Sequence, residues 1–137
     1  MTLAPEDKKA LSDIRITRAY EFLEDARANY NEGRYKTSVN RSYYATLNAV
    51  RAILILEGVN PETHEGVITM LSLRFIKPGL LPVDVIKKFK TLLSRRTDVD
   101  YGDFETISAA DAEDSLRIVQ EVIESIDKLR IEMSRDL

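Results

Sequence analysis

Apolar and polar residues alternate with the period of an α-helix along almost the whole chain. Between residues 34 and 57 the apolar positions recur at spacings of three and four, so they fall on one side of a helix; they are Val39, Tyr43, Leu47, Val50 and Leu54. Between residues 108 and 133 the apolar positions cover a broader arc. So wide an arc indicates either a central helix of a bundle or a helix that also meets a second subunit.

Glycine and proline divide this pattern into five predicted helices, at residues 5–31, 34–57, 61–75, 82–96 and 108–133. Ser108 with Asp111 three residues later is typical of a capping box at the start of the last helix. An acidic loop is expected before it, and no segment has a convincing strand pattern. The sequence therefore predicts an all-α fold, an antiparallel up-and-down bundle of four to five helices that forms a single domain over residues 1–137.

Composition narrows the chemistry that this fold can carry. The 137 residues include no Cys and a single His, His64, so disulfides and thiolate metal sites are excluded and a His-based zinc site within one chain is not expected. The carboxylates at 98, 100 and 103 lack the glycine and the final acid of a calcium loop. We expect no metal and no cofactor. No apolar run approaches about 18 residues and no secretory pattern opens the chain, so we expect a cytoplasmic protein without a membrane segment.

Charge is strongly segregated behind a formal net charge of −3. Residues 34–51 include four basic and no acidic side chains, and residues 74–96 include seven basic side chains against one acidic one. Residues 97–114 reverse this pattern, with seven acidic and no basic side chains. The basic segments either form a patch that attracts phosphate or are ordinary solvated helix faces.

A polar stripe on the second predicted helix is the first candidate site. Its residues follow a 3-4-3 spacing that places them along one flank: Arg41, Tyr44, Asn48 and Arg51. An aromatic ring and an amide between two guanidinium groups suit the binding of a phosphate and a base. The alternative is that Tyr44 is partly core and that both arginines pair with carboxylates of neighbouring helices.

The second candidate lies at the predicted end of the fourth helix. Arg95 and Arg96 there would meet the negative end of the helix dipole. Tyr101 follows Arg96 by five positions, with the predicted helix end between them, so the two could flank one pocket. An arginine there would neutralise a phosphoryl transition state without changing its protonation. We expect Arg96 and Tyr101 to share one cleft with the stripe on the second helix.

Three segments together resemble the HEPN-domain family, in its branch of small stand-alone proteins with Tyr-Tyr-Ala and Arg-x-x-Ala-Asp-Tyr segments. They are Asn40–Ala45, Thr63-His64 and Arg96–Tyr101, and the resemblance extends over about residues 14–129. It implies a helical bundle that is usually a homodimer. Many members are metal-independent ribonucleases of toxin–antitoxin and defence systems, and others pair with a small nucleotidyltransferase or serve as binding domains.

The sequence departs from the ribonuclease motif, in which a histidine follows the arginine after four to six residues. Tyr101 stands there, and a phenol with a pKa near 10 is a poor general base at pH 7. His64 is the candidate substitute, with helix capping or packing as its alternative role. We expect an RNA- or nucleotide-binding HEPN module, with Arg96, Tyr101 and His64 as catalytic candidates and Arg95 among the binding residues. It is either a metal-independent ribonuclease with an altered motif or a non-catalytic dimeric module that docks a nucleotidyltransferase. A third reading is a plain dimeric helical scaffold, which would bind neither anions nor nucleotides.

A tyrosine beside the motif is also the acceptor for the partner nucleotidyltransferase in related toxins. Tyr101 is therefore a candidate acceptor, although the usual tyrosine position, two residues beyond the histidine, is Asp103 here.

Overall fold

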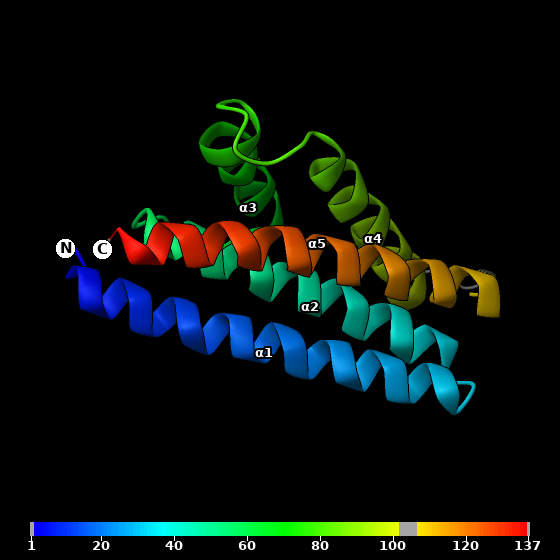
Figure 1. The fold of residues 1–137 in the computed structure, drawn as a ribbon. Coiled ribbons are helices and arrows are strands. Elements are labelled where there is room, and N and C mark those ends of the chain that lie inside the picture. Colours follow the sequence, from blue (N-terminus) through cyan, green and yellow to red (C-terminus); the bar gives the residue numbers. More distant parts are fainter. Residues whose placement is uncertain (1, 102–106, 137) are drawn as a thin grey trace.

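The computed structural model describes residues 2–101 and 107–136, and every regular element in these ranges is helical (Figure 1). The elements are α1 (Pro5–Asn31), α2 (Tyr35–Leu56), α3 (His64–Leu71), a π-helical turn η1 (Ser72–Ile76), α4 (Asp84–Tyr101) and α5 (Ala109–Arg135). This arrangement confirms the predicted all-α fold. No helix in the described ranges is long and apolar enough to cross a membrane.

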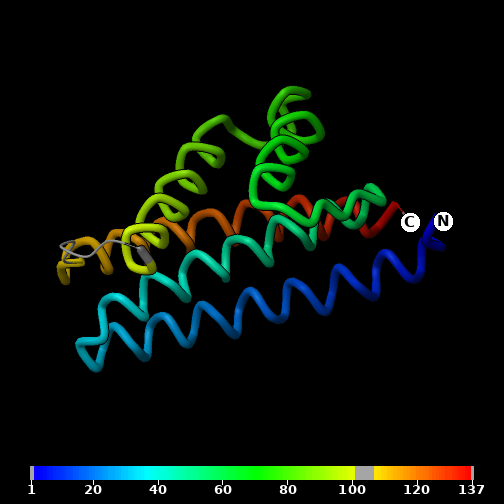
Figure 2. The backbone as a smooth tube through the Cα atoms, turned by 180° about the vertical axis from the view of Figure 1, so that it is seen from behind, coloured from blue at the N-terminus to red at the C-terminus, as the bar shows by residue number. Residues whose placement is uncertain are grey.

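Helix α2 is the centre of the bundle. It packs against α1, α3, α4 and α5, and its buried residues point in most directions around its axis. Helices α1, α2 and α5 lie side by side with both chain termini at one end, while α3 and α4 form an arm on one side (Figures 1 and 2). The largest core side chains come from α2, α3, η1, α4 and α5, including Tyr43, Leu71, Phe75, Phe89 and Ile123.

The broad apolar arc of α5 is covered within the chain. Its central residues, Ile118, Val119, Val122, Ile123 and Ile126, are all buried. Contacts with α2, α1 and α4 account for this burial. The arc therefore needs no second subunit to cover it, and the expected homodimer stays a prediction.

Most helix ends lie where the sequence places them. Helix α1 has the predicted bounds, and the capping box before α5 forms as expected, with the Asp111 amide bonded to Ser108 Oγ at 3.1 Å. Gly33 and Gly58 adopt positive φ angles of 77° and 74° just after α1 and α2. Only glycine takes this left-handed conformation without strain, so these residues end the two helices.

Two predicted boundaries are wrong. Helix α3 begins at His64 instead of residue 61, because Thr63 caps it and accepts a hydrogen bond from the Gly66 amide at 2.9 Å. Helix α4 does not end at Arg96 and no acidic loop begins at Thr97, since the helix continues to Tyr101. An ion pair between Arg96 Nε and Asp100 at 2.9 Å joins successive turns of this extension. Arg96 therefore lies inside a helix, with no helix end between it and Tyr101.

Candidate functional site

The polar stripe of α2 lies along the flank of α1. The guanidinium of Arg41 lies over the Phe22 ring of α1, 5.7 Å from its centroid, and the Tyr44 ring lies 5.9 Å from that same ring. About two turns before Phe22 on α1, Arg15 donates a hydrogen bond to the Arg51 carbonyl at 3.3 Å. The two helices therefore present arginines and aromatic rings together along about 15 Å of α2, from Arg41 to Arg51.

Helix α4 contributes Arg96 to the same region. Its Nη2 donates to the Tyr44 hydroxyl at 3.1 Å, and its guanidinium carbon lies 5.7 Å from the ring centroids of both Tyr43 and Tyr44. The ion pair with Asp100 fixes the other edge of the guanidinium. The structure thus brings Arg96 and Tyr44 together, whereas the Tyr101 side chain lies outside the described part of the structure.

Asn48 lies on the same stripe, and its amide nitrogen donates to the Tyr44 carbonyl at 2.9 Å. This bond stays within α2, so it orients the amide without tying the stripe to another helix. The amide oxygen remains an acceptor that a ligand on this flank can use.

His64 joins the group through Tyr43. The Tyr43 side chain is fully buried on α2, and its hydroxyl is hydrogen-bonded to Nδ1 of His64, the first residue of α3. Since Arg96 lies over the Tyr43 ring, the three residues form one cluster at the junction of α2, α3 and α4. Sequence analysis assigned Tyr43 to the core and missed this contact. The sequence did hold one sign of this contact: a tyrosine at a core position buries its hydroxyl, and a buried hydroxyl needs a hydrogen-bond partner.

Burial and nearby positive charges favour the neutral form of His64. Burial lowers its pKa first, and the positive charges of Arg96 and Arg51 lower it further. Burial also raises the pKa of Tyr43 to about 12, so its hydroxyl stays protonated at pH 7. A neutral imidazole therefore faces a neutral phenol, and the positive charges of Arg96 and Arg51 lie near both groups.

In the described part of the structure, three arginines of this region have no carboxylate partner. Among the described residues, Arg15, Arg41 and Arg51 form no ion pair, whereas Arg27 and Arg117 elsewhere each pair with carboxylates of their own helix. The alternative in which Arg41 and Arg51 pair with neighbouring carboxylates is therefore not what the structure shows. Burial lowers the pKa of Arg15, and so do the adjacent charges of Arg51 and Arg18.

We call this region the basic face and define it by Arg15, Arg41, Arg51 and Arg96 with the rings of Phe22 and Tyr44. Figure 2 shows the arrangement of the helices that contribute to it, with α2 between α1 and the arm formed by α3 and α4. In the described ranges no carboxylate neutralises the charges of Arg15, Arg41 and Arg51, and such charges attract anions, while the rings supply surfaces for stacking.

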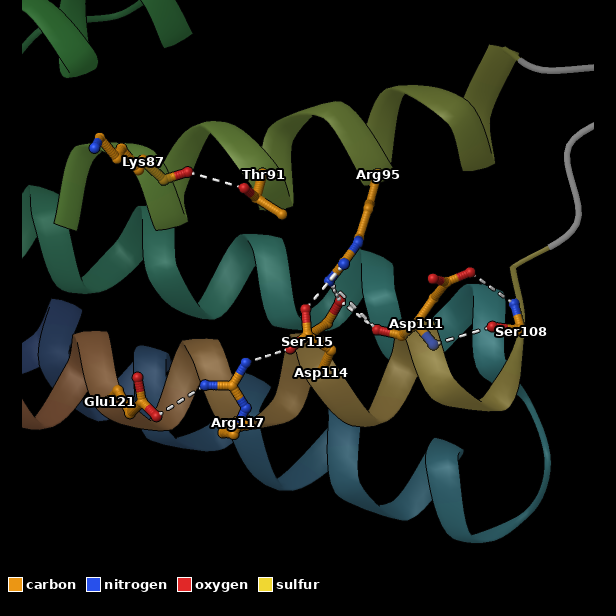
Figure 3. A network of polar contacts seen from close by, with 9 residues as sticks. All are labelled: Lys87, Thr91, Arg95, Ser108, Asp111, Asp114, Ser115, Arg117 and Glu121. Carbon is orange, nitrogen blue, oxygen red and sulfur yellow. Dashed lines mark hydrogen bonds and ion pairs between the residues drawn. The ribbon is translucent and has the colours of Figure 1, made fainter. Parts of the chain in front are cut away.

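Arg95 lies elsewhere, on the side of α4 that meets α5. Figure 3 shows it extending from α4 to α5, where it donates to Ser115 Oγ at 2.9 Å and pairs with Asp114 at 2.9 Å. A longer contact of 3.4 Å reaches the Asp111 carbonyl. Arg95 thus holds α4 on α5, and this expected binding residue is not part of the basic face.

Metal ligands do not gather in the described ranges, where no group of three or more His, Asp or Glu side chains is placed to hold an ion. Asp100 is the acidic side chain that the structure places against the basic face, and it is paired with Arg96.

Comparison with known proteins gives a consistent family. A model of the HEPN domain matches residues 12–129. A UPF0332 protein of Thermotoga maritima is 27% identical over 129 residues, which cover 94% of this chain and 98% of that protein. A protein of Methanocaldococcus jannaschii named Putative toxin MJ0142 is 32% identical over 98 residues, which cover 72% of this chain and 67% of its own length.

Two solved structures share the fold. The crystal structure of TT1696 from Thermus thermophilus matches with a TM-score of 0.75 at 16% identity, covering 86% of this chain and 97% of that one. The structure of ST0689, an archaeal HEPN homologue, matches with a TM-score of 0.71 at 18% identity, covering 87% and 97%. At such identities the likeness concerns the fold alone.

Proposed function

This chain belongs to the HEPN-domain family, and we propose that it is the RNA-binding module of a toxin–antitoxin or defence pair. The observation that carries the proposal is the basic face, on which Arg15, Arg41 and Arg51 have no carboxylate partner in the described ranges. The name of the M. jannaschii relative, a putative toxin, supports the toxin-like part of the proposal.

RNA suits this face for two physical reasons. Guanidinium groups bind phosphate oxygens through paired hydrogen bonds, and their attraction to the backbone does not depend on sequence. The half-buried rings of Phe22 and Tyr44 lie among these arginines, and aromatic rings stack on bases of any kind. A short single-stranded segment could therefore place its phosphates on the arginines and a base on the rings.

Catalysis in this proposal rests on Arg96. Its guanidinium keeps its charge at any physiological pH, and the contacts with Tyr44 and Asp100 hold it in place. Charge that builds up on phosphate oxygens during cleavage of the phosphodiester is stabilised by a donor already in position. His64 belongs to the same cluster through Tyr43, and it is the second catalytic candidate.

The test is cleavage of RNA by the purified protein in EDTA. We expect cleavage to persist in the chelator and Arg96→Ala to lower turnover roughly 10²-fold, as loss of one oxyanion donor does. Arg117→Ala is the matched control, because Arg117 pairs with carboxylates on α5 away from the basic face. Cleavage that EDTA abolishes, or that Arg96→Ala leaves unchanged, would contradict the catalytic part.

A second candidate function is a non-catalytic dimeric module that docks a nucleotidyltransferase. Two observations favour it: Tyr101 occupies the place of the motif histidine, and Nδ1 of His64 is already bonded to Tyr43. RNA that binds without being cleaved, together with transfer of AMP to Tyr101 by the partner enzyme, would support this alternative. Loss of the added mass in Tyr101→Phe would identify the acceptor.

A further inference from the structure

His64 and Tyr43 form a polar contact between α2 and α3 that involves the chain's single histidine. Tyr43 has no exposed surface, and His64 Nδ1 is the partner that the structure gives its hydroxyl in the described ranges. Nδ1 therefore faces the interior. The other ring nitrogen, Nε2, has no partner in the described ranges and is not among the fully buried atoms that lack one, so it retains some solvent-accessible surface on this half-buried side chain.

The buried hydroxyl selects one form of the imidazole. A neutral imidazole has one nitrogen that donates and one that accepts. If Nδ1 carried the proton and donated to Tyr43, the hydroxyl hydrogen would be left in the interior without an acceptor. If Tyr43 donates to Nδ1, both groups are satisfied and the imidazole proton lies on Nε2. Buried polar groups are nearly always satisfied, so the second arrangement holds.

The surroundings oppose a second proton on the ring. Burial lowers the pKa of His64, and the positive charges of Arg96 on α4 and Arg51 on α2 act in the same direction. Arg96 also lies over the Tyr43 ring. Burial raises the pKa of Tyr43, so this ring carries a neutral phenol and not a phenolate. His64 thus carries a single proton, and its solvent-side nitrogen is the one that holds it.

We propose that Tyr43 is a positioning residue that locks His64 as the neutral Nε2–H tautomer, so that His64 donates a hydrogen bond to a phosphate oxygen instead of accepting a proton. The phosphate contact rests on the proposed function, whereas the tautomer does not. A neutral N–H in the cluster that contains Arg96 would add a second donor to the candidate site.

Nitrogen NMR of the histidine ring tests the tautomer directly. The chain has one histidine, so its ring signals need no assignment to a residue. At pH 8 the wild-type protein should show a pyrrole-like Nε2 and a pyridine-like Nδ1. In Tyr43→Phe, which keeps the ring in the core, the two shifts should move toward the averaged values of a freely exchanging imidazole. A wild-type spectrum with the proton on Nδ1 overturns the proposal even if the variant does not fold.

Tyr44→Phe is the matched control. It removes a neighbouring hydroxyl that bonds to Arg96 and not to His64, so the tautomer pattern should stay that of the wild type. A change of pattern in Tyr44→Phe equal to that in Tyr43→Phe would show that general loosening of α2, and not the Tyr43 hydroxyl, sets the tautomer.

A titration with a short oligouridylate separates the two proposals. Binding should shift the Nε2 signal while the tautomer pattern is kept. If the wild-type pattern is the Nε2–H form and the oligouridylate binds without shifting the Nε2 signal, the lock stands and the phosphate contact of His64 fails. If the oligouridylate does not bind at all, the proposed function fails while the lock stands. If Nδ1 carries the proton, the lock fails whatever the RNA does.

Discussion

Tyr43 occupies a core position of α2 and also holds a polar group of the candidate site. Its ring is fully buried among the apolar residues of the bundle, and its hydroxyl is bonded to His64. A core residue is seldom also a site residue, but here the same burial that stabilises the fold keeps the phenol neutral.

The raised pKa of Tyr43 predicts a loss of stability in alkaline solution. The folded state holds the phenol proton up to a pKa of about 12, whereas the unfolded chain releases it near the ordinary value of 10.0. The stabilisation is therefore fully present below pH 10 and declines as the pH rises from 10 toward 12, by about 1 kcal/mol between pH 9 and pH 11. Urea unfolding at pH 9 and at pH 11 measures the decline.

In Tyr43→Phe this decline should be smaller, because the variant has no phenol to ionise at position 43. Part of it should remain, since the pKa of Tyr20 is also raised to about 12, by burial and by its bond to Asp127. A variant that loses as much stability between pH 9 and 11 as the wild type would disprove the buried, protonated state of Tyr43.

For single residues, the sequence predicts the position on a helix better than it predicts the side chain that the residue contacts. Helical spacing alone places Arg41, Tyr44, Asn48 and Arg51 on one flank, and all four residues lie within α2 in the structure. Which side chain meets which neighbour depends on how helices far apart in the sequence cross. The bond from Tyr43 to His64 and the attachment of Arg95 to α5 both span such crossings, so a helical pattern does not reveal them.

Helix α3 places His64 through the way in which it begins. Thr63 caps the helix, and Gly66 approaches this cap so closely that an added Cβ would lie 2.9 Å from Thr63 Oγ1 and 3.1 Å from Pro61 Cβ. Such contacts are too short to be tolerated without a shift of the cap. Gly66 is therefore required because no room exists for a Cβ. It is not required by its backbone conformation, since it is not among the glycines with a positive φ.

Gly66→Ala should destabilise the protein by about 1 kcal/mol, the usual cost of a lost N-cap, despite the better helix propensity of alanine. Urea unfolding measures this loss, and Thr63→Ala, which removes the cap itself, should show a loss of similar size. Gly66→Ala with stability equal to or above that of the wild type would mean that the α3 N-terminus is looser than described.

Among the elements, the helix ends that glycine and capping residues determine were predictable, and the end of α4 was not. The acidic run after Arg96 resembles a loop by composition. The ion pair from Arg96 to Asp100 and the bond from Thr97 Oγ1 to the Leu93 carbonyl at 2.9 Å show that these residues instead have helical partners one turn earlier. Partners at this spacing favour a helix that polar composition alone does not predict.

The whole molecule is expected to be a homodimer, on the basis of the family resemblance. A two-fold arrangement that joined the basic faces would align two copies of Arg41 and Arg96 along one groove. Light scattering at micromolar concentration should give twice the mass of the 15.6 kDa chain. A strictly monomeric mass across that range would remove the dimer from the account and leave the basic face of one chain as the site.

The central claim is that the basic face binds the phosphates of RNA, and the salt dependence of RNA affinity tests it most directly. The wild-type protein should lose affinity steeply as salt rises. In the double variant Arg41→Gln with Arg51→Gln, the slope of log affinity against log salt should fall by about 1.4, because each phosphate contact on a single strand contributes about 0.7.

The control for this measurement is Arg27→Gln with Arg117→Gln, which removes the same charge from exposed arginines that pair with carboxylates on their own helices. Its slope should equal that of the wild type. Equal slopes for the wild type and for both double variants would contradict the claim, since the arginines of α2 would then make no phosphate contact.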